Sequence, residues 1–430
     1  MLNALLDGAR PDLDTLISHF GSRFSDLHLF RGTPQDPEWH AEGDVHTHTQ
    51  MVLDELYRSL DSPDGKALSG EVQRELILGA MLHDLSKPHT TRTMQIRGVE
   101  RIGAPQHEAK GRSAVAVGLM GIGLPWRSVW HIMGMVGSHH EPKLLVVKDR
   151  SPGEYRRISR RVDPMRVAWL ERADMRGRTC PDRDHQIETI DLFQLGAEEY
   201  APTGWNDRWR THFAERLADR PAAFQDWVFG QAIRAFESDQ IATPEEADFL
   251  TYQEPHPPEL VVFSGPSGSG KSTFVQNYLQ KPEHFHQVVS MDEIREALAG
   301  DRSDQALNGA VRQAARNQLK AALRPGKRVV WDATGLRRDF RSIVIDTGFS
   351  YGALVTLVVF QQSVEEYRRG NQRRAHPVPP SVLNAQLESW EWPEVDEAHR
   401  VLVVNGKGEV QGAFGLCGDV LPWGLRWALP

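Results

Sequence analysis

The chain has 430 residues, a length that suits two or three domains, each large enough to bury a hydrophobic core. Its 50 lysines and arginines against 58 aspartates and glutamates give a formal net charge of −8, which excludes a protein that coats nucleic acid through overall positive charge. Two cysteines, Cys180 and Cys417, exclude a disulfide framework, and the lack of a basic leader or of a run of about 18 apolar residues predicts a soluble cytoplasmic protein without membrane contact.

The first half of the chain predicts helices. Apolar residues recur at helical spacing in 47–60, 69–88, 108–123, 127–140 and 166–177, whereas strand patterns are almost absent before residue 255. Pro88 stops the second of these helices, so that His83 and Asp84 fall near its buried end. Ten of the 18 histidines lie between His28 and His140. The sequence therefore predicts an all-α N-terminal domain in which imidazole groups are concentrated.

The segment TYQEPHPPEL (251–260) separates two kinds of pattern. Its three prolines disfavour helix and suit an extended connector, so we place the domain boundary there, between domains 1–255 and 256–430. Beyond it, short β-branched runs alternate with helix-length polar stretches, which predicts an α/β domain with a parallel sheet. The expected strands are 259–265, 286–292, 327–334, 352–361 and 400–404.

The helical half carries an ordered set of imidazole and carboxylate groups, each on a predicted helix or just beyond one. Such donors suit divalent transition metals, and Mn, Co, Ni, Fe and Zn all remain open as the ion. An adjacent His-Asp pair can serve two ions if the carboxylate bridges them. The candidate metal ligands are His48, His83, Asp84, His107, His139, His140 and Asp174.

This ordered set resembles the HD phosphohydrolase superfamily. HTHTQMV (46–52) matches its first histidine and HDLSK (83–87) its signature doublet, and the resemblance covers residues from about 40 to 185. It implies two divalent metal ions and hydrolysis of a phosphate ester, with Lys87 helping to anchor the ester. Of His139 and His140, one is expected to bind metal and the other to donate to the substrate phosphate, in an order that stays open.

A second feature of this half is a local excess of arginine. Between Arg150 and Arg183 lie ten arginines and five acidic residues. Such a run is a candidate track for a nucleic-acid backbone, and the alternative is an ordinary solvated helical face.

The second half contains GPSGSGKST (265–273), which satisfies G-x-x-x-x-G-K-[ST] between a predicted strand and a predicted helix. In this motif backbone N–H groups surround phosphate oxygens at a helix N-terminus, Lys271 reaches the terminal phosphates and Ser272 faces Mg²⁺. We therefore expect ATP or another nucleoside triphosphate with Mg²⁺, and Asp332 as an outer Mg²⁺ partner or a packing residue. The expected nucleotide-binding residues are Gly265, Ser267, Gly268, Ser269, Gly270, Lys271, Ser272, Thr273 and Asp332.

The segments that follow this loop, 288–305, 327–341 and 367–391, resemble the 5′-OH polynucleotide kinases over residues from about 259 to 395. The resemblance implies that Asp292 is the general base for the 5′-hydroxyl and that Arg295 contacts a phosphate of the acceptor strand. The alternative for Asp292 is a helix cap, and Gly335 stands where such kinases more often have asparagine. Phosphoryl transfer also needs cations around the moving group, so Lys271 is expected to act in catalysis. One of Arg369, Arg373 and Arg374, on a mobile lid, is expected to close on ATP.

An HD unit followed by a polynucleotide kinase resembles the bacterial HD-Pnk end-healing enzymes. That resemblance implies hydrolysis of 2′,3′-cyclic phosphate, 2′-phosphate or 3′-phosphate ends by the first domain and phosphorylation of 5′-OH ends by the second. RNA and DNA ends fit equally, and sealing would fall to a separate ligase. Two alternatives stay open: an HD nucleotide phosphohydrolase joined to a small-molecule kinase, and a regulatory protein that senses ATP.

Overall fold

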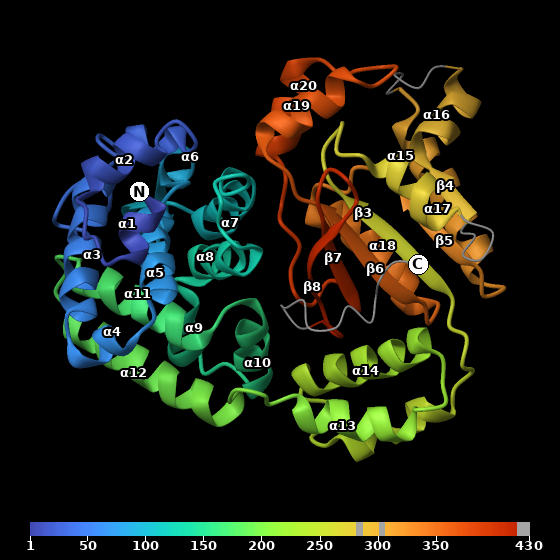
Figure 1. The fold of residues 1–430 in the computed structure, drawn as a ribbon, viewed down its shortest axis with the longest axis horizontal. Helices are drawn as coiled ribbons and strands as arrows, with labels where there is room; N and C mark the ends of the chain where they lie inside the picture. The colour runs from blue at the N-terminus through green and yellow to red at the C-terminus, as the bar shows by residue number, and fades with distance from the viewer. Residues whose placement is uncertain (281–286, 301–305, 419–430) are drawn as a thin grey trace. The chain divides into compact units, whose positions relative to one another are not determined.

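The computed structural model describes residues 1–280, 287–300 and 306–418, in two compact units, Met1–Thr203 and Gly204–Pro430 (Figure 1). Among these residues, every helix is too short or too polar to cross a bilayer. His286, the first residue of an expected strand, and the tail from 419 to 430 lie outside the described residues.

The N-terminal unit is built around α3, α5, α8 and α11, which pack on one another. Each of α3, α5 and α11 begins at a side-chain cap, with Asp44, Ser69 and Asp163 accepting a backbone N–H of the first turn. The elements of this unit are α1 (Leu2–Leu6), α2 (Leu13–Phe20), the 3-10 turn η1 (Ser25–Leu29), α3 (Val45–Leu60), α4 (Pro63–Ala67), α5 (Gly70–Leu82), α6 (Lys87–Thr90), β1 (Arg92–Ile96), β2 (Val99–Gly103), α7 (His107–Gly118), α8 (Trp126–Ser138), α9 (Glu141–Val147), α10 (Pro152–Arg161), α11 (Pro164–Arg176) and α12 (Arg183–Tyr200).

The expectation of an all-α domain needs one correction, the antiparallel hairpin of β1 and β2. Arg97 and Gly98 both have positive φ, 53° and 79°, and form its two-residue turn. Neither strand contains a buried residue. Because the hairpin lies on the surface, its strands, RTMQI and VERIG, contain few apolar residues and give only a weak strand pattern.

The C-terminal unit contains a six-stranded sheet in the order β4-β5-β3-β6-β7-β8. The α/β expectation is confirmed, and β4, β5, β3, β6 and β7 are parallel neighbours. The sheet is mixed, because β8 returns antiparallel to β7. The sequence of β8, VQGAF, has too few β-branched residues to predict a strand.

Helices cover the parallel strands, since α17 packs on β4 and β5, α18 packs on β3 and β6, and α14 also packs on β6. The central strand β6 is therefore buried at every residue. The elements of this unit are α13 (Asp207–Arg216), α14 (Ala222–Glu237), the 3-10 segment η2 (Pro244–Tyr252), β3 (Glu259–Ser264), α15 (Lys271–Phe274), the π-helical turn η3 (Val275–Leu279), β4 (Gln287–Ser290), α16 (Met291–Ala299), α17 (Asn308–Leu323), β5 (Arg328–Asp332), α18 (Arg338–Ser350), β6 (Leu354–Phe360), α19 (Val364–Gln372), α20 (Pro380–Glu388), β7 (Arg400–Val404) and β8 (Val410–Phe414).

The two units divide at Thr203 and Gly204, well before the proline-rich segment chosen from the sequence. The intervening helices α13 and α14 share a core with Leu416 and Cys417, which follow β8. The Arg400 guanidinium of β7 also donates to Asp226 of α14 at 2.9 Å. The helical segment before residue 255 thus packs with the sheet, and the prolines form a connection inside the C-terminal unit.

A buried arginine ties α18 to the chain before β7. The Arg341 guanidinium donates twice to the Glu397 carboxylate, at 2.9 Å each, and to the carbonyl oxygens of Gly335, Leu336 and Glu391 at 3.0, 2.7 and 2.9 Å. Both side chains are buried, so each charge depends on the other.

We expect Arg341→Met to destabilise the C-terminal unit by about 3–5 kcal/mol, because it leaves the Glu397 carboxylate buried without its main partner. Arg328→Met is the matched control, since its ion pair with Glu259 is 41% exposed on the arginine side and is worth roughly 1 kcal/mol or less. The measurement is the urea midpoint of each variant. Equal midpoints for the two variants would contradict the role given to Arg341.

Candidate functional site

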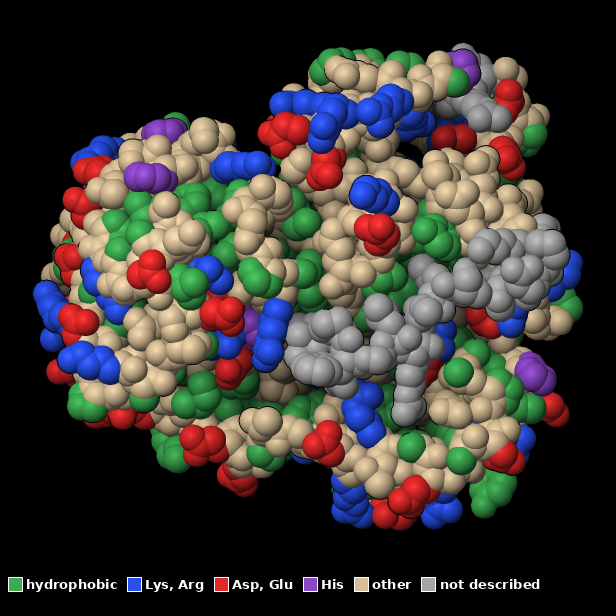
Figure 2. Space-filling view, viewed as in Figure 1, with side chains coloured by type: hydrophobic (Ala, Val, Ile, Leu, Met, Phe, Trp, Pro, Cys, Tyr) green, Lys and Arg blue, Asp and Glu red, His purple; other side chains and the backbone are tan. Residues whose placement is uncertain are grey.

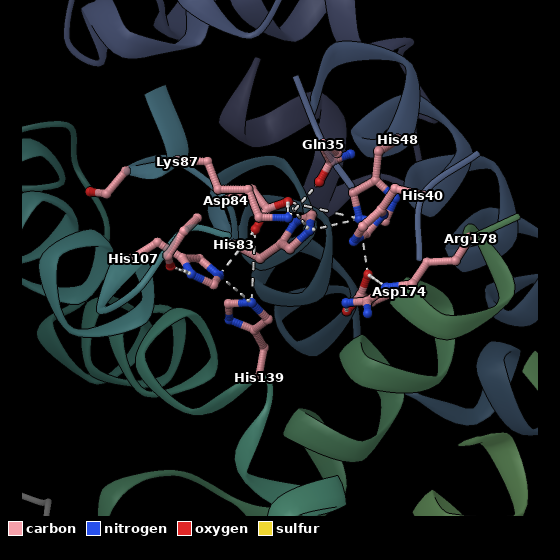
Figure 3. Close-up of polar contacts among 12 residues, drawn as sticks. Gln35, His40, His48, His83, Asp84, Lys87, His107, His139, Asp174 and Arg178 are labelled. Carbon is pink, nitrogen blue, oxygen red and sulfur yellow. Dashed lines mark hydrogen bonds and ion pairs between the residues drawn. The ribbon is translucent and has the colours of Figure 1, made fainter. Parts of the chain in front are cut away.

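The predicted metal ligands converge inside the N-terminal unit. Figure 3 labels all of them except His140, and shows the labelled side chains pointing toward one another. All are buried except His140, whose side chain is 23% exposed. The residues are His48 of α3, His83 and Asp84 at the end of α5, His107 at the start of α7, His139 and His140 after α8, and Asp174 of α11.

The Asp84 carboxylate lies at the centre of this cluster. Its Oδ2 atom is 3.2 Å from Nε2 of His83 and 3.8 Å from Nε2 of His48. Its Oδ1 atom is 3.4 Å from Nε2 of His107 and 3.9 Å from Nε2 of His139. Each oxygen thus faces a different pair of imidazoles, as a carboxylate that bridges two cations would.

Main-chain carbonyls set the tautomers of three of these rings. The Nδ1 atoms of His83, His107 and His139 lie 2.7, 2.6 and 2.9 Å, respectively, from the carbonyl oxygen of the residue three positions earlier. Because a carbonyl only accepts, we place the proton on Nδ1, which leaves the Nε2 lone pairs facing Asp84. Nε2 of His107 is 3.3 Å from Nε2 of His139. Two lone pairs at that distance repel each other unless a cation lies between them.

The charge states of the cluster also suit a cation. Burial, with the neighbouring imidazoles, lowers the pKa of His139 well below its usual value, so the ring is neutral. Burial opposes ionisation of Asp84, but the neighbouring charges, among them the Lys87 ammonium, outweigh it and hold the pKa of that carboxyl well below its usual range. Arg178 does the same for the pKa of Asp174 against its burial. Neutral imidazoles and ionised carboxylates are the forms that bind divalent metals.

The donor atoms fall into two sets on either side of Asp84. His48, His83 and Asp174 form one set and His107, His139 and His140 the other, with donor atoms within 4.8 Å of one another in each. Nitrogen-rich sets with carboxylates fit divalent transition metals better than Mg²⁺ or Ca²⁺.

Lys87 and two residues that sequence reasoning missed complete the cluster. The Lys87 ammonium lies 2.7 Å from Asp84 Oδ2 and donates to Gln35 Oε1 at 2.6 Å, so it is buried among the ligands. The Glu42 carboxylate accepts from Nδ1 of His40 at 2.8 Å and lies 3.0 Å from Nδ1 of His48. Gln35 and Glu42 come from a nonperiodic segment, and no motif marks them.

The arginine-rich segment is largely neutralised within the fold. Arg157 lies 2.9 Å from Glu154, Arg166 lies 2.8 Å from Glu75, and Arg172 lies 2.6 Å from Asp191. Arg160 and Arg161 are buried. For these arginines a structural role replaces the phosphate track that the composition suggested.

The phosphate-binding loop lies between β3 and α15 in the C-terminal unit, at the carboxyl edge of the parallel strands. The Lys271 ammonium donates to the carbonyl oxygens of Gly265 and Pro266 at 2.9 and 2.8 Å and to Ser269 Oγ at 3.3 Å. Oxygen atoms of the loop thus hold the Lys271 ammonium in place. Asp332 lies at the same edge of the sheet, because it is paired in register with Ser290, the last residue of β4.

The start of the expected lid is packed on this loop. A Cβ atom on Gly370 of α19 would lie 2.1 Å from the carbonyl oxygen of Gly268, so only glycine allows the approach. Tyr367 fixes the same helix, since its hydroxyl donates to the Phe360 carbonyl at 2.5 Å and accepts from the Gln362 N–H at 3.1 Å. The base of α19 is therefore held against the loop, where the sequence predicted a mobile element.

A cavity of about 1690 Å³ opens between the loop and the segment from α19 to α20. Figure 2 shows basic side chains gathered over that segment. Gly265 and Ser269 lie outside the lining, and the other expected residues of this unit line it. These are Ser267, Gly268, Gly270, Lys271, Ser272, Thr273, Asp292, Arg295, Asp332, Arg369, Arg373 and Arg374.

Asp292 lies on the first turn of α16 but does not cap it. Ser290 is the cap, with its hydroxyl accepting from the Glu293 N–H at 3.3 Å. The Asp292 side chain is 60% exposed and lies 2.7 Å from the Arg295 guanidinium. The carboxylate is thus available to a ligand in the cavity.

The glycine found in place of asparagine also has a structural reason. Gly335 has a φ of 53°, and a Cβ there would lie 2.0 Å from the carbonyl oxygen of Phe263. Burial raises the pKa of the nearby Asp332 carboxyl, and Lys271 partly opposes this.

Two glutamines near the loop carried no signal in the sequence. Gln386 of α20 accepts from the Ser267 N–H at 2.7 Å, and Gln362 donates to the Ser269 carbonyl at 2.7 Å. Their contacts depend on α19 and α20 folding back over the loop, which local sequence patterns do not specify.

Comparison with known proteins bears on this unit. A protein-family model described as an AAA domain matches residues 260–393. No curated protein sequence matches the chain. One matching solved structure is an unliganded sugar kinase from Janibacter sp. HTCC2649, with 21% identity, a TM-score of 0.27, and coverage of 36% of this chain and 88% of that chain. The family match and the loop together indicate a P-loop nucleotide-binding domain, which implies a bound nucleotide with Mg²⁺.

The pH dependence of nucleotide binding follows from Lys271. Burial lowers the pKa of its ammonium to about 8, against the opposing effect of Asp332. Phosphates bind the protonated form, so affinity for Mg·ATP is full below that pKa and is lost as pH rises through it. We expect roughly fivefold to tenfold weaker binding at pH 9 than at pH 7.5. Lys271→Arg stays charged, so its equilibrium titrations should be flat over this range, and an equal slope in both proteins would contradict the assignment.

Proposed function

We propose that the chain processes both ends of a broken polynucleotide. The C-terminal unit would transfer the γ-phosphoryl group of ATP to a 5′-OH end, and the N-terminal unit would hydrolyse a 2′,3′-cyclic phosphate, a 2′-phosphate or a 3′-phosphate. The observation that carries the proposal is the pairing on one chain of the Asp84 cluster with a P-loop cavity that contains an available carboxylate, Asp292.

In the kinase reaction the loop N–H groups and Lys271 would hold the β- and γ-phosphates. The acceptor O5′ forms the new bond to the γ-phosphorus, the bond to the bridging oxygen of ADP breaks, and Asp292 takes the hydroxyl proton. Arg295, 2.7 Å from Asp292, would orient that carboxylate. Ser272 and Asp332 line the cavity and would hold Mg²⁺, which would neutralise the phosphoryl oxygens. Arg369, Arg373 and Arg374 also line the cavity.

The cavity is large enough to hold an acceptor as well as a nucleotide. Pockets for small ligands usually enclose roughly 300–1,000 Å³. The cavity here, of about 1690 Å³, leaves room beside a nucleoside triphosphate for the end of a strand.

In the phosphoesterase reaction, a pair of divalent cations would lower the pKa of water and neutralise the phosphoryl oxygens. We assign His48, His83, Asp174, His107 and His139 as ligands and Asp84 as the bridge. His140 is partly exposed and paired with Glu108 at 2.8 Å, so it lies at the rim and would contact the substrate phosphate. Lys87 would orient Asp84, from 2.7 Å, rather than bind the ester directly.

The proposal is tested with one oligonucleotide that carries a 5′-OH and a 2′,3′-cyclic phosphate. Asp292→Asn should lower transfer of the [γ-³²P]ATP label about 100-fold or more while leaving cyclic-phosphate hydrolysis unchanged, because a general base contributes on that scale. Asp84→Asn should do the reverse.

In each variant, the activity of the unit without the substitution shows that this unit is still folded. Label that appears on nucleosides but not on the oligonucleotide would refute the polynucleotide assignment. An Asp292→Asn protein that transfers phosphate normally would refute the base, and loss of both activities in either folded variant would refute two independent sites.

A further inference from the structure

An exposed aromatic side chain lies close to two guanidinium groups on the C-terminal unit. Phe340, on the first turn of α18, is 44% exposed. The guanidinium carbon of Arg312 lies 4.8 Å from the centre of its ring, and that of Arg337 lies 5.3 Å away. Arg337 also pairs with Asp339 at 2.6 Å, whereas Arg312 comes from the neighbouring helix α17. Aromatic rings flanked by arginine are the surfaces on which nucleic-acid bases stack.

A chain of contacts links this group to Asp292, the carboxylate proposed as the base for the acceptor hydroxyl. Asp292 pairs with Arg295, and Arg295 donates to Asn308 Oδ1 at 3.4 Å. Asn308 lies one turn before Arg312 on α17, and all four of these residues line the cavity. The residues therefore form a continuous path from the carboxylate assigned to the 5′-hydroxyl, out of the cavity, to the ring of Phe340.

The helix along this path is basic. Arg316 and Lys320 follow Arg312 at intervals of four residues, which places all three on one face of α17. The helix, NGAVRQAARNQLKAAL, contains no acidic residue. In a chain with a net charge of −8, such a face is a local attraction for a polyanion.

We propose that Phe340, Arg312 and Arg316 bind the single-stranded acceptor polynucleotide beyond its 5′-terminal nucleotide. A base stacks on the exposed part of the Phe340–Arg312 group, and the basic face of α17 contacts the phosphates that follow. The inference rests on the proposed kinase function and adds the reason why a strand is preferred over a nucleoside.

The test compares two acceptors, a single-stranded 5′-OH oligonucleotide and a nucleoside 3′-monophosphate, in the full chain. Phe340→Ala should raise the KM for the oligonucleotide roughly fivefold to a hundredfold, the range expected for loss of one stacked base. The KM for ATP, the kcat and the reaction of the monophosphate should not change. Phe340→Trp should restore the oligonucleotide KM, which a merely structural role would not predict.

Two further variants sharpen the result. Ile343→Ala is the matched control, since Ile343 lies on the same helix, is 38% exposed and has no ring, and it should leave every constant unchanged. Arg316→Ala should weaken oligonucleotide binding and reduce the slope of log affinity against log salt by about 1.

The outcomes separate the two proposals. If the wild-type chain labels the oligonucleotide and Phe340→Ala leaves its KM unchanged, the stacking site is wrong while the kinase stands. An equal loss with the monophosphate acceptor would also overturn the stacking site, because it would show damage to the cavity. If the wild-type chain labels no oligonucleotide, the proposed function fails and this inference fails with it.

Discussion

The buried carboxylate of Asp84 is the constraint on which the N-terminal unit depends. A carboxylate and several imidazoles removed from water are costly unless each charge and lone pair has a partner. Lys87 compensates part of the charge from 2.7 Å. The Nε2 atoms of His107 and His139 lie 3.3 Å apart and both face Asp84, an arrangement that a cation between them would stabilise. The helices α3, α5, α7, α8 and α11 each contribute to or flank this cluster, so their packing encloses a polar interior.

The C-terminal unit has a different kind of site, which would bind phosphate through a loop rather than through a cluster of buried carboxylates. Its loop holds one ammonium, that of Lys271, at the carboxyl edge of a parallel sheet, and the contact between Gly268 and Gly370 fixes α19 beside it. Asp332 and Asp292 approach the same edge from β5 and α16. The site of the N-terminal unit is therefore a cluster of histidines and carboxylates, and that of the C-terminal unit is a glycine-rich loop. The two sites share no residue. That separation is why we expect two activities that can be lost one at a time.

The local features of this chain could be predicted from its sequence, whereas features that depend on distant neighbours could not. The five parallel strands of the C-terminal unit and the loop at 265–273 follow from short-range pattern, and the structure confirms them. The ordered histidines and aspartates predicted one cluster because each falls at a helix end or on a buried face. The hairpin at 92–103 was missed because it is exposed, and β8 because its residues are weak strand formers. Gln35, Glu42 and Gln386 reach their sites only through tertiary folding. A helical pattern also does not show which part of the chain α13 and α14 pack against.

The central claim is that the Asp84 cluster holds a pair of divalent cations. Anomalous X-ray diffraction from crystals of the full chain grown with Mn²⁺, recorded above and below the manganese absorption edge, tests it most directly. The account predicts two peaks that share Asp84 as a ligand, one contacting His48, His83 and Asp174 and the other contacting His107 and His139. An absence of peaks at these side chains, with the same imidazoles still facing one another, would contradict it.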